Sequence, residues 1–396
     1  MFKQAFKYRI YPTKKQEKLL FWTLARCREL YNAALSERRD AYKYEHKSIT
    51  YRMQADDLPE IKGIIREEYQ DIHSQVLQNV LKRLNTAFEN FFRRVQNGEE
   101  PGYPRFQGRN RYNSFTYPQS GYSLSEKYVT FSKIGTIMCV VHRPLQGKPK
   151  TCTIKYEAGQ WYAVFSCEIE TPEKLPESLE DVGIDLGVSH LATLSNGEMI
   201  EHPRYYRKAK KTLERRQQSL SRKRRGSYRR DKARKLVAKA HRKVRNQRRD
   251  FLHKQSRKVV NRYHVIVFED IQTKNLTRKP KPKQDEATGQ YLPNGAAAKG
   301  GLNKSILDAG WATFVEMCSV KAAWAGRTLL KVDPRSTSQV CSGCGQVREK
   351  ELSERWHSCD CGTELDRDVN AAINILERGR KCPTQAVAGT FRHRTA

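Results

Sequence analysis

Four cysteines near the C-terminal end have the spacing of a metal site. Cys341 and Cys344 are separated by two residues, and Cys359 and Cys361 follow as a second pair after fourteen intervening residues. Four thiolates at tetrahedral corners suit zinc, and two such pairs on facing hairpins form a zinc ribbon. Four protein ligands leave no open position, so the predicted site is structural. The second pair has one intervening residue where two are usual, and His357 stays an alternative ligand to Cys359.

Three acidic residues could form a second site. Asp185 and Glu269 each end an apolar run of strand type, and Asp368 opens a helical pattern. Acids at the ends of neighbouring parallel strands converge at one edge of a sheet. Two divalent cations about 4 Å apart need several such carboxylates, and this pair of ions promotes phosphodiester hydrolysis by activating water. The three residues therefore predict a metal-dependent phosphodiesterase site.

Neighbouring acids and other motifs do not compete with this interpretation. Strand alternation places Asp270 on the face opposite Glu269, and Asp366 fits better as the N-cap of the following helix. The sequence contains no GxxxxGK[ST] phosphate loop, no GxSxG elbow and no HExxH motif. The GIDLG run at 183–187 is similar to the phosphate-binding strand of actin-like ATPases, but the nucleotide motifs of those proteins are missing.

The first half of the chain is expected to form a separate domain. Residues 1–11 alternate as a strand, and a capping box of Thr13 and Gln16 begins a helix. A second helix begins near Ser74, and β-type runs follow over residues 103–170, which predicts an antiparallel barrel or sandwich that the first strand joins. The apolar faces of the two helices are formed by Leu20, Leu24, Cys27, Tyr31 and Leu35, and by Leu77, Leu81, Leu84, Phe88, Phe91 and Val95.

The second half must position the acids and cysteines. We expect a linker at 171–180, strands ending at the first two acids, a hairpin turning at Asn196 and Gly197, and a tail after Lys381 that is disordered. Further expectations are a mobile loop over 277–304, one helix over 305–325, a strand after Gly326 and a final helix from Asp366.

The charge of the chain points to a polyanionic partner. The 396 residues carry a formal net charge of +32, and residues 204–249 hold 22 Lys and Arg against only Glu214 and Asp231. This excess indicates nucleic acid first and an anionic membrane second. The segment predicts one or two exposed basic helices broken near Gly226. Its apolar residues are too sparse for a buried stripe; they are Leu213, Leu220, Leu236, Val237 and Val244.

Composition also suggests a cellular location. Hydrophobic residues make up 38% and aromatic residues 10% of the chain, which supports folded cores. The sequence has neither a signal-peptide pattern nor an apolar run of membrane-spanning length. Six further cysteines are scattered, which is typical of a reducing compartment, with Cys382 as a candidate exposed thiol. We expect a cytoplasmic protein without a membrane partner.

Several stretches, read in order, resemble the TnpB family, the RNA-guided nucleases of insertion sequences that are related to compact type V CRISPR effectors. They are GIDLGVSHLATLSNGE, VIVFEDIQTKNL, ILDAGWATF, KVDPRSTSQVCSGCG and CGTELDRDVNAAINIL, together with the N-terminal KYRIYPTKKQEKLL and the stretch from Gly102 to Phe106. The resemblance covers roughly residues 1–380. The combination of TSQVCSGCG with DRDVNAAINI is highly specific.

This resemblance implies a multi-domain α/β protein. It implies a RuvC-like nuclease of ribonuclease H fold, in which Asp185, Glu269 and Asp368 hold two Mg²⁺ ions. It also implies a zinc ribbon inserted before the last acid, and an N-terminal wedge-type β-barrel that carries a helical recognition insertion. The expected ranges are 1–19 and 98–172 for the barrel, 20–97 for the insertion, 180–338 and 364–380 for the nuclease with basic helices at 204–262, 339–363 for the ribbon and 381–396 for the tail.

The resemblance further implies a guide RNA transcribed from the end of the element and a double-stranded DNA target, in a prokaryotic cytosol or nucleoid. The protein would read a short motif beside the target while the guide reads the sequence. Candidate phosphate contacts are Arg222, Lys223, Arg224, Arg225, Arg229 and Arg230. A candidate stacking platform combines Tyr8, Arg9, Tyr11, Tyr103, Arg105 and Phe106, for which core packing is the alternative.

The interpretation that combines these features is an RNA-guided, Mg²⁺-dependent DNA endonuclease of an insertion sequence. Three alternatives are a guide-directed DNA-binding repressor without cleavage, a strand-transferring transposase, and a zinc-ribbon RNA-binding protein. A repressor should have lost one of the three acids, and all are present. A transposase needs an assembly, and the sequence shows no coiled-coil heptads. An RNA-binding protein leaves the acids without a purpose.

Overall fold

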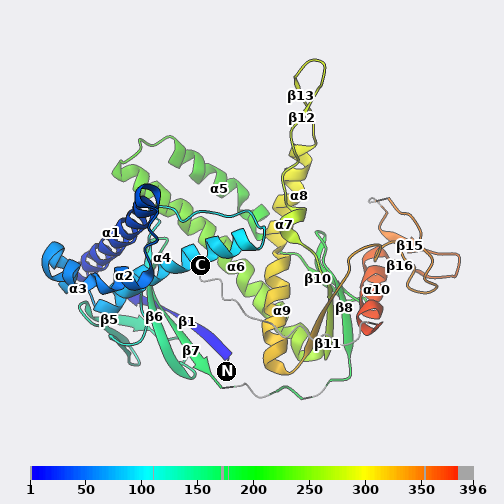
Figure 1. The fold of residues 1–396 in the computed structure, drawn as a ribbon. Helices are drawn as coiled ribbons and strands as arrows, with labels where there is room; N and C mark the ends of the chain where they lie inside the picture. The colour runs from blue at the N-terminus through cyan, green and yellow to red at the C-terminus, as the bar shows by residue number, and fades with distance from the viewer. Residues whose placement is uncertain (1, 110, 171–173, 177, 352–353, 382–396) are drawn as a thin grey trace. The chain divides into compact units, whose positions relative to one another are not determined.

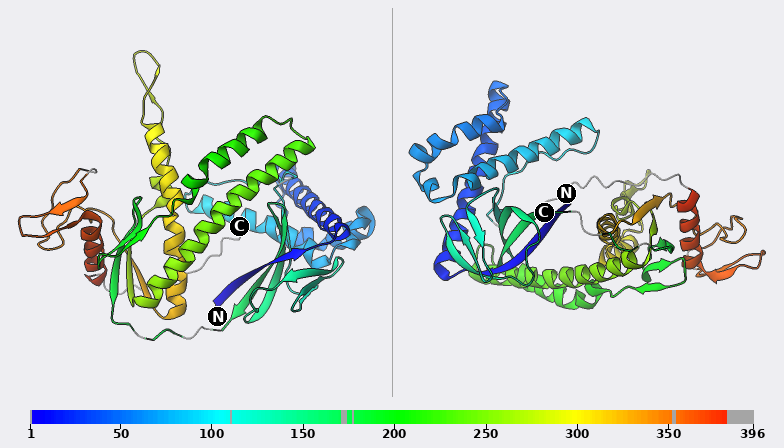
Figure 2. Two further views of the ribbon diagram at one scale, coloured as in Figure 1. Left: turned by 180° about the vertical axis from the view of Figure 1, so that it is seen from behind. Right: turned by 90° about the horizontal axis from the view of Figure 1, so that it is seen from below.

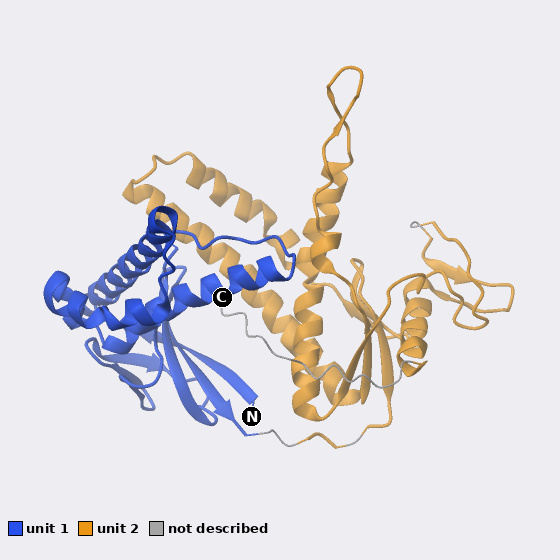
Figure 3. Cartoon of the chain, in the orientation of Figure 1, with its two compact units in different colours: residues 1–171 blue, residues 172–396 orange. Residues whose placement is uncertain are grey.

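The computed structural model describes residues 2–109, 111–170, 174–176, 178–351 and 354–381 (Figure 1, Figure 2). The chain divides into two compact units, residues 1–171 and 172–396 (Figure 3). The predicted linker lies partly outside the described residues. The predicted tail, including Cys382, lies outside them. Among the described residues, no helix has both the length and the apolar character needed to cross a bilayer.

Unit 1 contains a seven-stranded antiparallel sheet with the order β2-β6-β7-β1-β5-β4-β3. The first strand pairs with β7 and β5, which confirms that it joins the later strands. All seven strands belong to one hydrogen-bonded sheet. The strands are β1 Phe2–Tyr11, β2 Ser114–Tyr117, β3 Tyr122–Leu124, β4 Tyr128–Phe131, β5 Gly135–Val140, β6 Lys148–Glu157 and β7 Gln160–Ile169.

The helices of unit 1 lie between β1 and β2 in the chain. They are α1 Lys14–Glu45, α2 Tyr51–Asp56, α3 Leu58–Glu60, the π-helical turn η1 Ile61–Ile65, the 3₁₀ turn η2 Glu67–Asp71, and α4 Ser74–Gln96. The predicted capping box is confirmed, since the Thr13 side chain accepts from the amide of Gln16 and the Gln16 side chain accepts from the amide of Thr13. The whole predicted face of α1 is buried. On α4, Leu77, Leu81 and Leu84 are buried, whereas Val95 is 50% exposed.

Unit 2 contains a five-stranded sheet with the order β10-β9-β8-β11-β14. Its strands are β8 Asp181–Asp185, β9 His190–Leu194, β10 Met199–Glu201, β11 Val265–Glu269 and β14 Thr328–Val332. Strands β8, β11 and β14 are parallel, and β9 and β10 run antiparallel as a hairpin that turns at Gly197, as predicted. The parallel pair β8 and β11 brings the ends of the two acid-bearing strands to the same edge.

Helices cover both faces of this sheet. The helices of unit 2 are α5 Tyr205–Ser221, α6 Tyr228–Arg262, α7 Thr273–Leu276, α8 Ala296–Ala309, α9 Trp311–Ala325 and α10 Arg367–Lys381. Buried residues of α6 and α9 pack on one face, and α10 packs on the other (Figure 1). Gly183 permits this approach, because a Cβ there would lie 2.0 Å from the carbonyl oxygen of Ala372 in α10.

Two expectations for the segment between β11 and β14 are wrong. Residues 277–304 are not simply a loop, because they include the hairpin β12 Lys283–Gln284 with β13 Tyr291–Leu292 and the start of α8. Residues 305–325 are not one helix, because Gly310 adopts φ 76° and separates α8 from α9. Glycine tolerates this left-handed conformation, which ends one helix and begins the next.

The basic segment forms a helical hairpin, with the predicted break at Gly226. The expectation of no buried stripe is wrong, because Leu213 of α5 and Val237 and Val244 of α6 are buried. Two long helices that pack on each other need few apolar residues each, and the stems of long basic side chains cover further apolar surface. Arginine and lysine therefore fill the remaining outward positions.

The carboxylate of Asp308 joins this hairpin to the rest of unit 2. Both of its oxygens lie 3.0 Å from the amide nitrogen of Tyr206, at the N-terminus of α5, and Arg248 of α6 approaches to 3.7 Å. The side chain is 6% exposed. It therefore caps a helix that lacks a side-chain cap of its own.

Asp308→Ala is expected to destabilise unit 2 by about 1 to 3 kcal/mol, because it leaves the partly buried amide of Tyr206 without its acceptor and removes the ion pair with Arg248. The melting temperature should fall by about 2 to 4 °C for each kcal/mol. Asp308→Asn retains one acceptor oxygen and should lose less. Differential scanning calorimetry of both variants tests this, and an unchanged melting temperature for Asp308→Ala would contradict the capping role.

Candidate active site and metal centre

The structure brings the three candidate acids to one edge of the five-stranded sheet. Asp185 is the last residue of β8 and Glu269 the last residue of the adjacent parallel strand β11. Asp368 lies in the first turn of α10, which packs against β8. A Cβ placed on Gly187 would lie 4.0 Å from Oδ2 of Asp368, so the loop after Asp185 runs beside this carboxylate.

The electrostatics of this edge favour a bound cation. Burial, and then the charges of Glu269 and Asp368, raise the pKa of Asp185 to about 8. Burial also raises the pKa of Glu269, against the hydrogen bond from the Thr337 hydroxyl, which lowers it. Carboxylates whose charges act on one another in a buried site resist simultaneous ionisation. A divalent cation removes that cost, and oxygen ligands are those that Mg²⁺ prefers, so the donor set fits magnesium.

Two arginines border the acids, and sequence reasoning did not select them. The guanidinium of Arg355 lies 3.9 Å from Oδ2 of Asp368, and that of Arg367 lies 3.7 Å from Oδ1. The Asp368 side chain is 16% exposed, so it is partly accessible. For Arg367, the sequence offered a signal in the run Asp366-Arg367-Asp368, because a residue between two acids at the start of a helix must lie near both.

The two acids set aside from the sequence have other partners. Asp270 is exposed and pairs with Lys331 at 3.3 Å. Oδ1 of Asp366 accepts from the amide of Asp368 at 2.8 Å, so Asp366 is the N-cap of α10, as predicted. This cap fixes the first turn of the helix and thereby the backbone that carries Asp368.

The four cysteines form a compact cluster. The Sγ atoms of Cys341, Cys344, Cys359 and Cys361 all lie within 4.8 Å of one another, and two Sγ pairs are 3.6 Å apart. Tetrahedral zinc with Zn–S bonds of about 2.3 Å places sulfurs about 3.8 Å apart. The sulfur positions therefore fit a zinc ion. The short hairpin β15 Trp356–Ser358 with β16 Glu364–Asp366 presents the second cysteine pair.

His357 lies beside this cluster and is not one of its four members. Its side chain is fully buried and contacts the amine of Lys350. Burial opposes ionisation of the Cys341 thiol, but hydrogen bonds from His357 and from the backbone of residues 343 and 344 outweigh it and lower the pKa to about 5. The lowered pKa therefore favours the thiolate form of Cys341, which is the form that binds metal.

The candidate phosphate contacts have different environments. Arg222, Arg224, Arg225 and Arg229, around the turn of the α5–α6 hairpin, are exposed, and Lys223 is partly buried. Arg230 instead donates to the carbonyl oxygens of Leu220 and Lys223, at 3.0 and 2.8 Å. Its guanidinium holds the turn that presents its neighbours, a contact with no signal in the sequence.

The candidate stacking platform of unit 1 separates into two groups. Tyr8 is fully buried and its hydroxyl donates to the carbonyl of Arg143, so it belongs to the core and the stacking interpretation is wrong for it. Tyr103 is 46% exposed, with its ring edge-on to Phe88 and Phe91, and Arg105 is exposed. Tyr11 and Phe106 are exposed as well, with the guanidinium of Arg9 or Arg39 over the ring.

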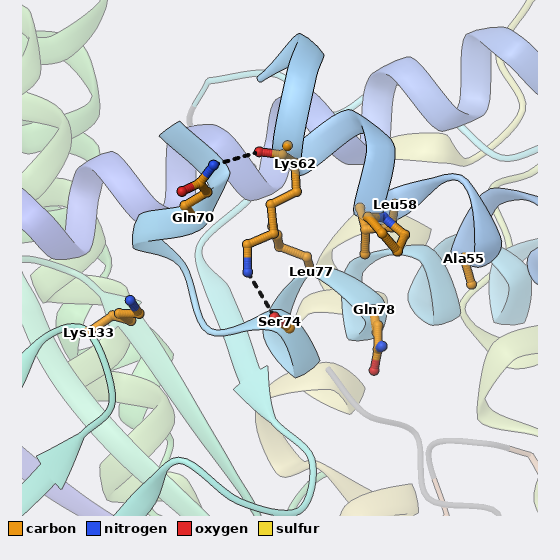
Figure 4. A pocket seen from close by; sticks show the side chains of 10 residues that line it. Ala55, Leu58, Lys62, Gln70, Ser74, Leu77, Gln78 and Lys133 are labelled. Atoms are coloured by element: carbon orange, nitrogen blue, oxygen red, sulfur yellow. Dashed lines mark hydrogen bonds between the residues drawn. The ribbon is translucent and has the colours of Figure 1, made fainter. Parts of the chain in front are cut away.

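Unit 1 also contains a polar cavity of about 550 Å³ (Figure 4). Lys62 donates to the Ser74 hydroxyl at 2.9 Å, at the N-terminus of α4, and Lys133 comes from the turn between β4 and β5. The remaining lining residues are Ala55, Leu58, Pro59, Gly63, Gln70, Leu77 and Gln78. Its basic character suits an anionic group.

Family models match three parts of the chain. Residues 164–279 match a model described as "Probable transposase", and residues 311–375 match the Cas12f1-like TNB domain, which spans the cysteine cluster. Residues 1–47 match a model described as a helix-turn-helix domain. The structure differs from that description, because residues 2–47 contain strand β1 and the single long helix α1.

Relatives match nearly the whole chain. A protein of Streptomyces pristinaespiralis named "Putative RNA-guided DNA endonuclease" is 35% identical over 385 residues, covering 95% of this chain and 89% of the relative. The InsQ protein of Escherichia coli K12, with the same description, is 34% identical and covers 95% and 92%. The solved structure of the mini-RNA-guided endonuclease CRISPR-Cas_phi3 has a similar fold, with a TM-score of 0.50, 10% identity and coverage of 96% and 92%.

The helices and strands of its two units make this chain a mixed α/β protein, with a fold similar to that of the solved structure. The chain belongs to the TnpB family, which confirms the resemblance noted in the sequence.

Proposed function

We propose that this chain is an RNA-guided DNA endonuclease of an insertion sequence, as the names of its relatives indicate. The observation that carries the proposal is the convergence of Asp185, Glu269 and Asp368 at one sheet edge, where burial and then the charges of the other two acids raise the pKa of Asp185. A repressor without cleavage is not favoured, because it would not need this costly arrangement. The family model that matches residues 164–279 is described as a probable transposase, but the relatives that match nearly the whole chain are named RNA-guided DNA endonucleases.

The architecture supports the finer assignments. We assign unit 2 to a RuvC-like domain of ribonuclease H fold, over 180–338 and 364–380, because three antiparallel strands are followed by two parallel ones and helices cover both faces. We assign residues 339–363 to an inserted zinc ribbon. In unit 1, the ring of Tyr117 on β2 stacks on Phe131 of β4 at 5.5 Å, which supports a sheet curled into a wedge-type barrel over 1–19 and 98–172, with 20–97 inserted.

The three acids would hold two Mg²⁺ ions. When bound, these ions activate a water molecule and stabilise the leaving oxygen of the phosphodiester. Asp185 lies centrally, since both other carboxylates act on it. Strand β11 and the N-capped start of α10 hold Glu269 and Asp368 in place. No covalent intermediate is required, so no nucleophilic side chain is assigned. Cys341, Cys344, Cys359 and Cys361 would hold a structural zinc ion.

The partners of this enzyme would be a guide RNA, transcribed from the end of the element, and a double-stranded DNA target in the prokaryotic cytoplasm. The protein would read a short motif beside the target. The exposed arginines around the turn of the α5–α6 hairpin, with Lys223, would contact phosphates, and Tyr103 and Arg105 of unit 1 would contribute a stacking surface.

Replacing Arg222, Arg224, Arg225 and Arg229 with glutamine is expected to weaken guide RNA binding at least about tenfold near 150 mM salt. Log affinity falls with log salt, and each lost phosphate contact makes this slope shallower by about 0.7 to 0.9. The loss of four contacts should therefore reduce the magnitude of the slope by about 3. Filter binding at several salt concentrations measures both quantities.

A matched control replaces Lys14, Lys15 and Lys18 of α1 with glutamine, which tests for a general effect of net charge. Equal losses of slope per residue in both variants would show that the hairpin turn is not a dedicated contact.

The proposed function is tested by purifying the chain, expressed with its native flanking DNA, and sequencing the RNA that accompanies it. The expected RNA is one species that ends in a stretch set by the flanking DNA. A mixture of ribosomal and transfer RNA would show that the basic helices bind any polyanion, and would remove the support for a guide.

A further inference from the structure

Glu269 does not stand alone at the end of its strand. Its Oε1 accepts a hydrogen bond from the hydroxyl of Thr337. Both side chains are buried, at 9% and 4% exposure. The same hydroxyl lies 3.3 Å from the carbonyl of Pro334, a longer contact. Thr337 follows strand β14 and precedes the first cysteine by four residues. It belongs to the TSQVCSGCG stretch, which the proposed mechanism leaves without a role apart from the cysteines.

The backbone of this segment is held by one face of α10. Asn374 donates to the carbonyl oxygens of Thr337 and Val340, at 2.9 and 2.7 Å. One turn earlier, Asn370 donates to Val340 at 2.7 Å and accepts from the amide of Ser342 at 2.9 Å. Both asparagines are buried. Arg378, one turn later, donates to the carbonyls of residues 333 and 335.

These contacts form a continuous connection between the candidate sites. Asn370, Asn374 and Arg378 are spaced four residues apart and share a face of the helix. That helix also carries Asp368 in its first turn. Residues 333–342 are thus fixed to the helix that carries one acid, and through Thr337 they contact a second acid. Amide side chains are costly to bury unless they are hydrogen-bonded, so the two asparagines specify the position of this segment.

We infer that Thr337 is a positioning residue for Glu269, and that Asn374 sets the position of Thr337. The inference rests on the proposed function, since it takes Glu269 as a metal-binding carboxylate. The hydroxyl fixes one carboxylate oxygen and leaves Oε2 to face a cation. Without the hydroxyl, a buried oxygen loses its donor and the carboxylate can rotate. Partners that orient a metal ligand from outside typically change metal affinity or activity by about 10- to 100-fold.

The experiment compares Thr337→Val, which keeps the shape and removes the hydroxyl, with Thr337→Ser, which keeps the hydroxyl. The guide-loaded protein is titrated with Mg²⁺ in a cleavage assay and with Mn²⁺ in an electron paramagnetic resonance binding assay without a cleavable target. Thr337→Val is expected to raise the Mn²⁺ dissociation constant and the half-maximal Mg²⁺ concentration by about 10-fold or more. Thr337→Ser should stay within about 3-fold of the wild type.

The controls separate this role from general damage. Thr23→Val removes another buried hydroxyl, in α1 of unit 1, and should leave both titrations unchanged. Affinity for target DNA should be unaltered in all variants. Thr337→Ala gives a second variant without the hydroxyl if Thr337→Val does not fold, and it should show the same shifts in both titrations.

Glu269→Gln distinguishes the two possible failures. If Glu269→Gln cleaves normally, the proposed active site is wrong. If Glu269→Gln is inactive while Thr337→Val and Thr337→Ala match the wild type in both titrations, the positioning role is wrong and the proposed function stands. A loss in Thr337→Ser as large as that in Thr337→Val would also overturn the positioning role, because the hydroxyl would then not be the deciding group.

Discussion

Replacing Asp185 with alanine is expected to lower DNA cleavage by about 1,000-fold or more, the size of loss seen when a central catalytic group is removed. Burial, and then the charges of Glu269 and Asp368, raise the pKa of Asp185 to about 8, and its removal takes away the carboxylate on which both other acids act. Guide RNA binding should not change, because the basic helices are untouched. Cleavage of a matched plasmid and RNA binding are measured on the same preparation, with Asp270→Ala as the control outside the site.

The same acid makes a prediction about pH and stability. The folded pKa of Asp185 is about 8 against an ordinary 3.8, so between these values the folded state binds the extra proton and stability falls as pH rises. Asp185→Asn removes this cost in the metal-free protein. Its melting temperature should exceed that of the wild type by an amount that grows from pH 5 to pH 8 and vanishes below about pH 4. An equal or lower melting temperature at pH 8 would contradict the electrostatic description of the site.

Loss of the zinc ligands is expected to have the second largest effect. Structural zinc contributes about 10 to 16 kcal/mol to the folding of small zinc domains at neutral pH. Cys341→Ser or Cys361→Ser should therefore lower the zinc content below one ion per chain, expose residues 339–363 to proteolysis and abolish cleavage. Elemental analysis and limited proteolysis measure the first two effects. Cys318→Ala, a change at a buried cysteine outside the cluster, should retain the zinc.

The choice between Cys359 and His357 has its own test. His357→Gln is expected to retain zinc, because the four cysteine sulfurs already form a complete cluster. Cys359→Ser should lose it. If His357→Gln loses zinc and Cys359→Ser retains it, then His357 is the fourth ligand and Cys359 does not bind the ion.

The meeting of the candidate acids and the cysteine cluster could be predicted from the sequence because both depend on local patterns. Asp185 and Glu269 each end a buried apolar run, so a parallel sheet had to bring them to one edge. The cysteine spacing likewise specified a cluster without knowledge of the fold. In unit 1, the alternation over residues 1–11 predicted the strand β1.

What the sequence could not predict depends on contacts between distant residues. Thr337 meets Glu269 across 68 positions, and threonine is too common a residue to mark such a contact. The buried stripe of the α5–α6 hairpin was missed because each helix alone has too few apolar residues. The expected helix over 305–325 contains Gly310, and only the positive φ of this glycine shows that the helix is broken there. The cavity of unit 1 combines short helical turns with Lys133 from a β-turn.

Reprogrammed cleavage tests the proposed function most directly. The chain is purified with its guide RNA, and the variable end of that RNA is then replaced so that it matches a second plasmid site beside the same short motif. The expected result is Mg²⁺-dependent cleavage that moves to the new site and is absent with Asp185→Ala. Cleavage that stays at the original site, occurs without a matching guide, or persists in Asp185→Ala would contradict an RNA-guided nuclease that acts through these three acids.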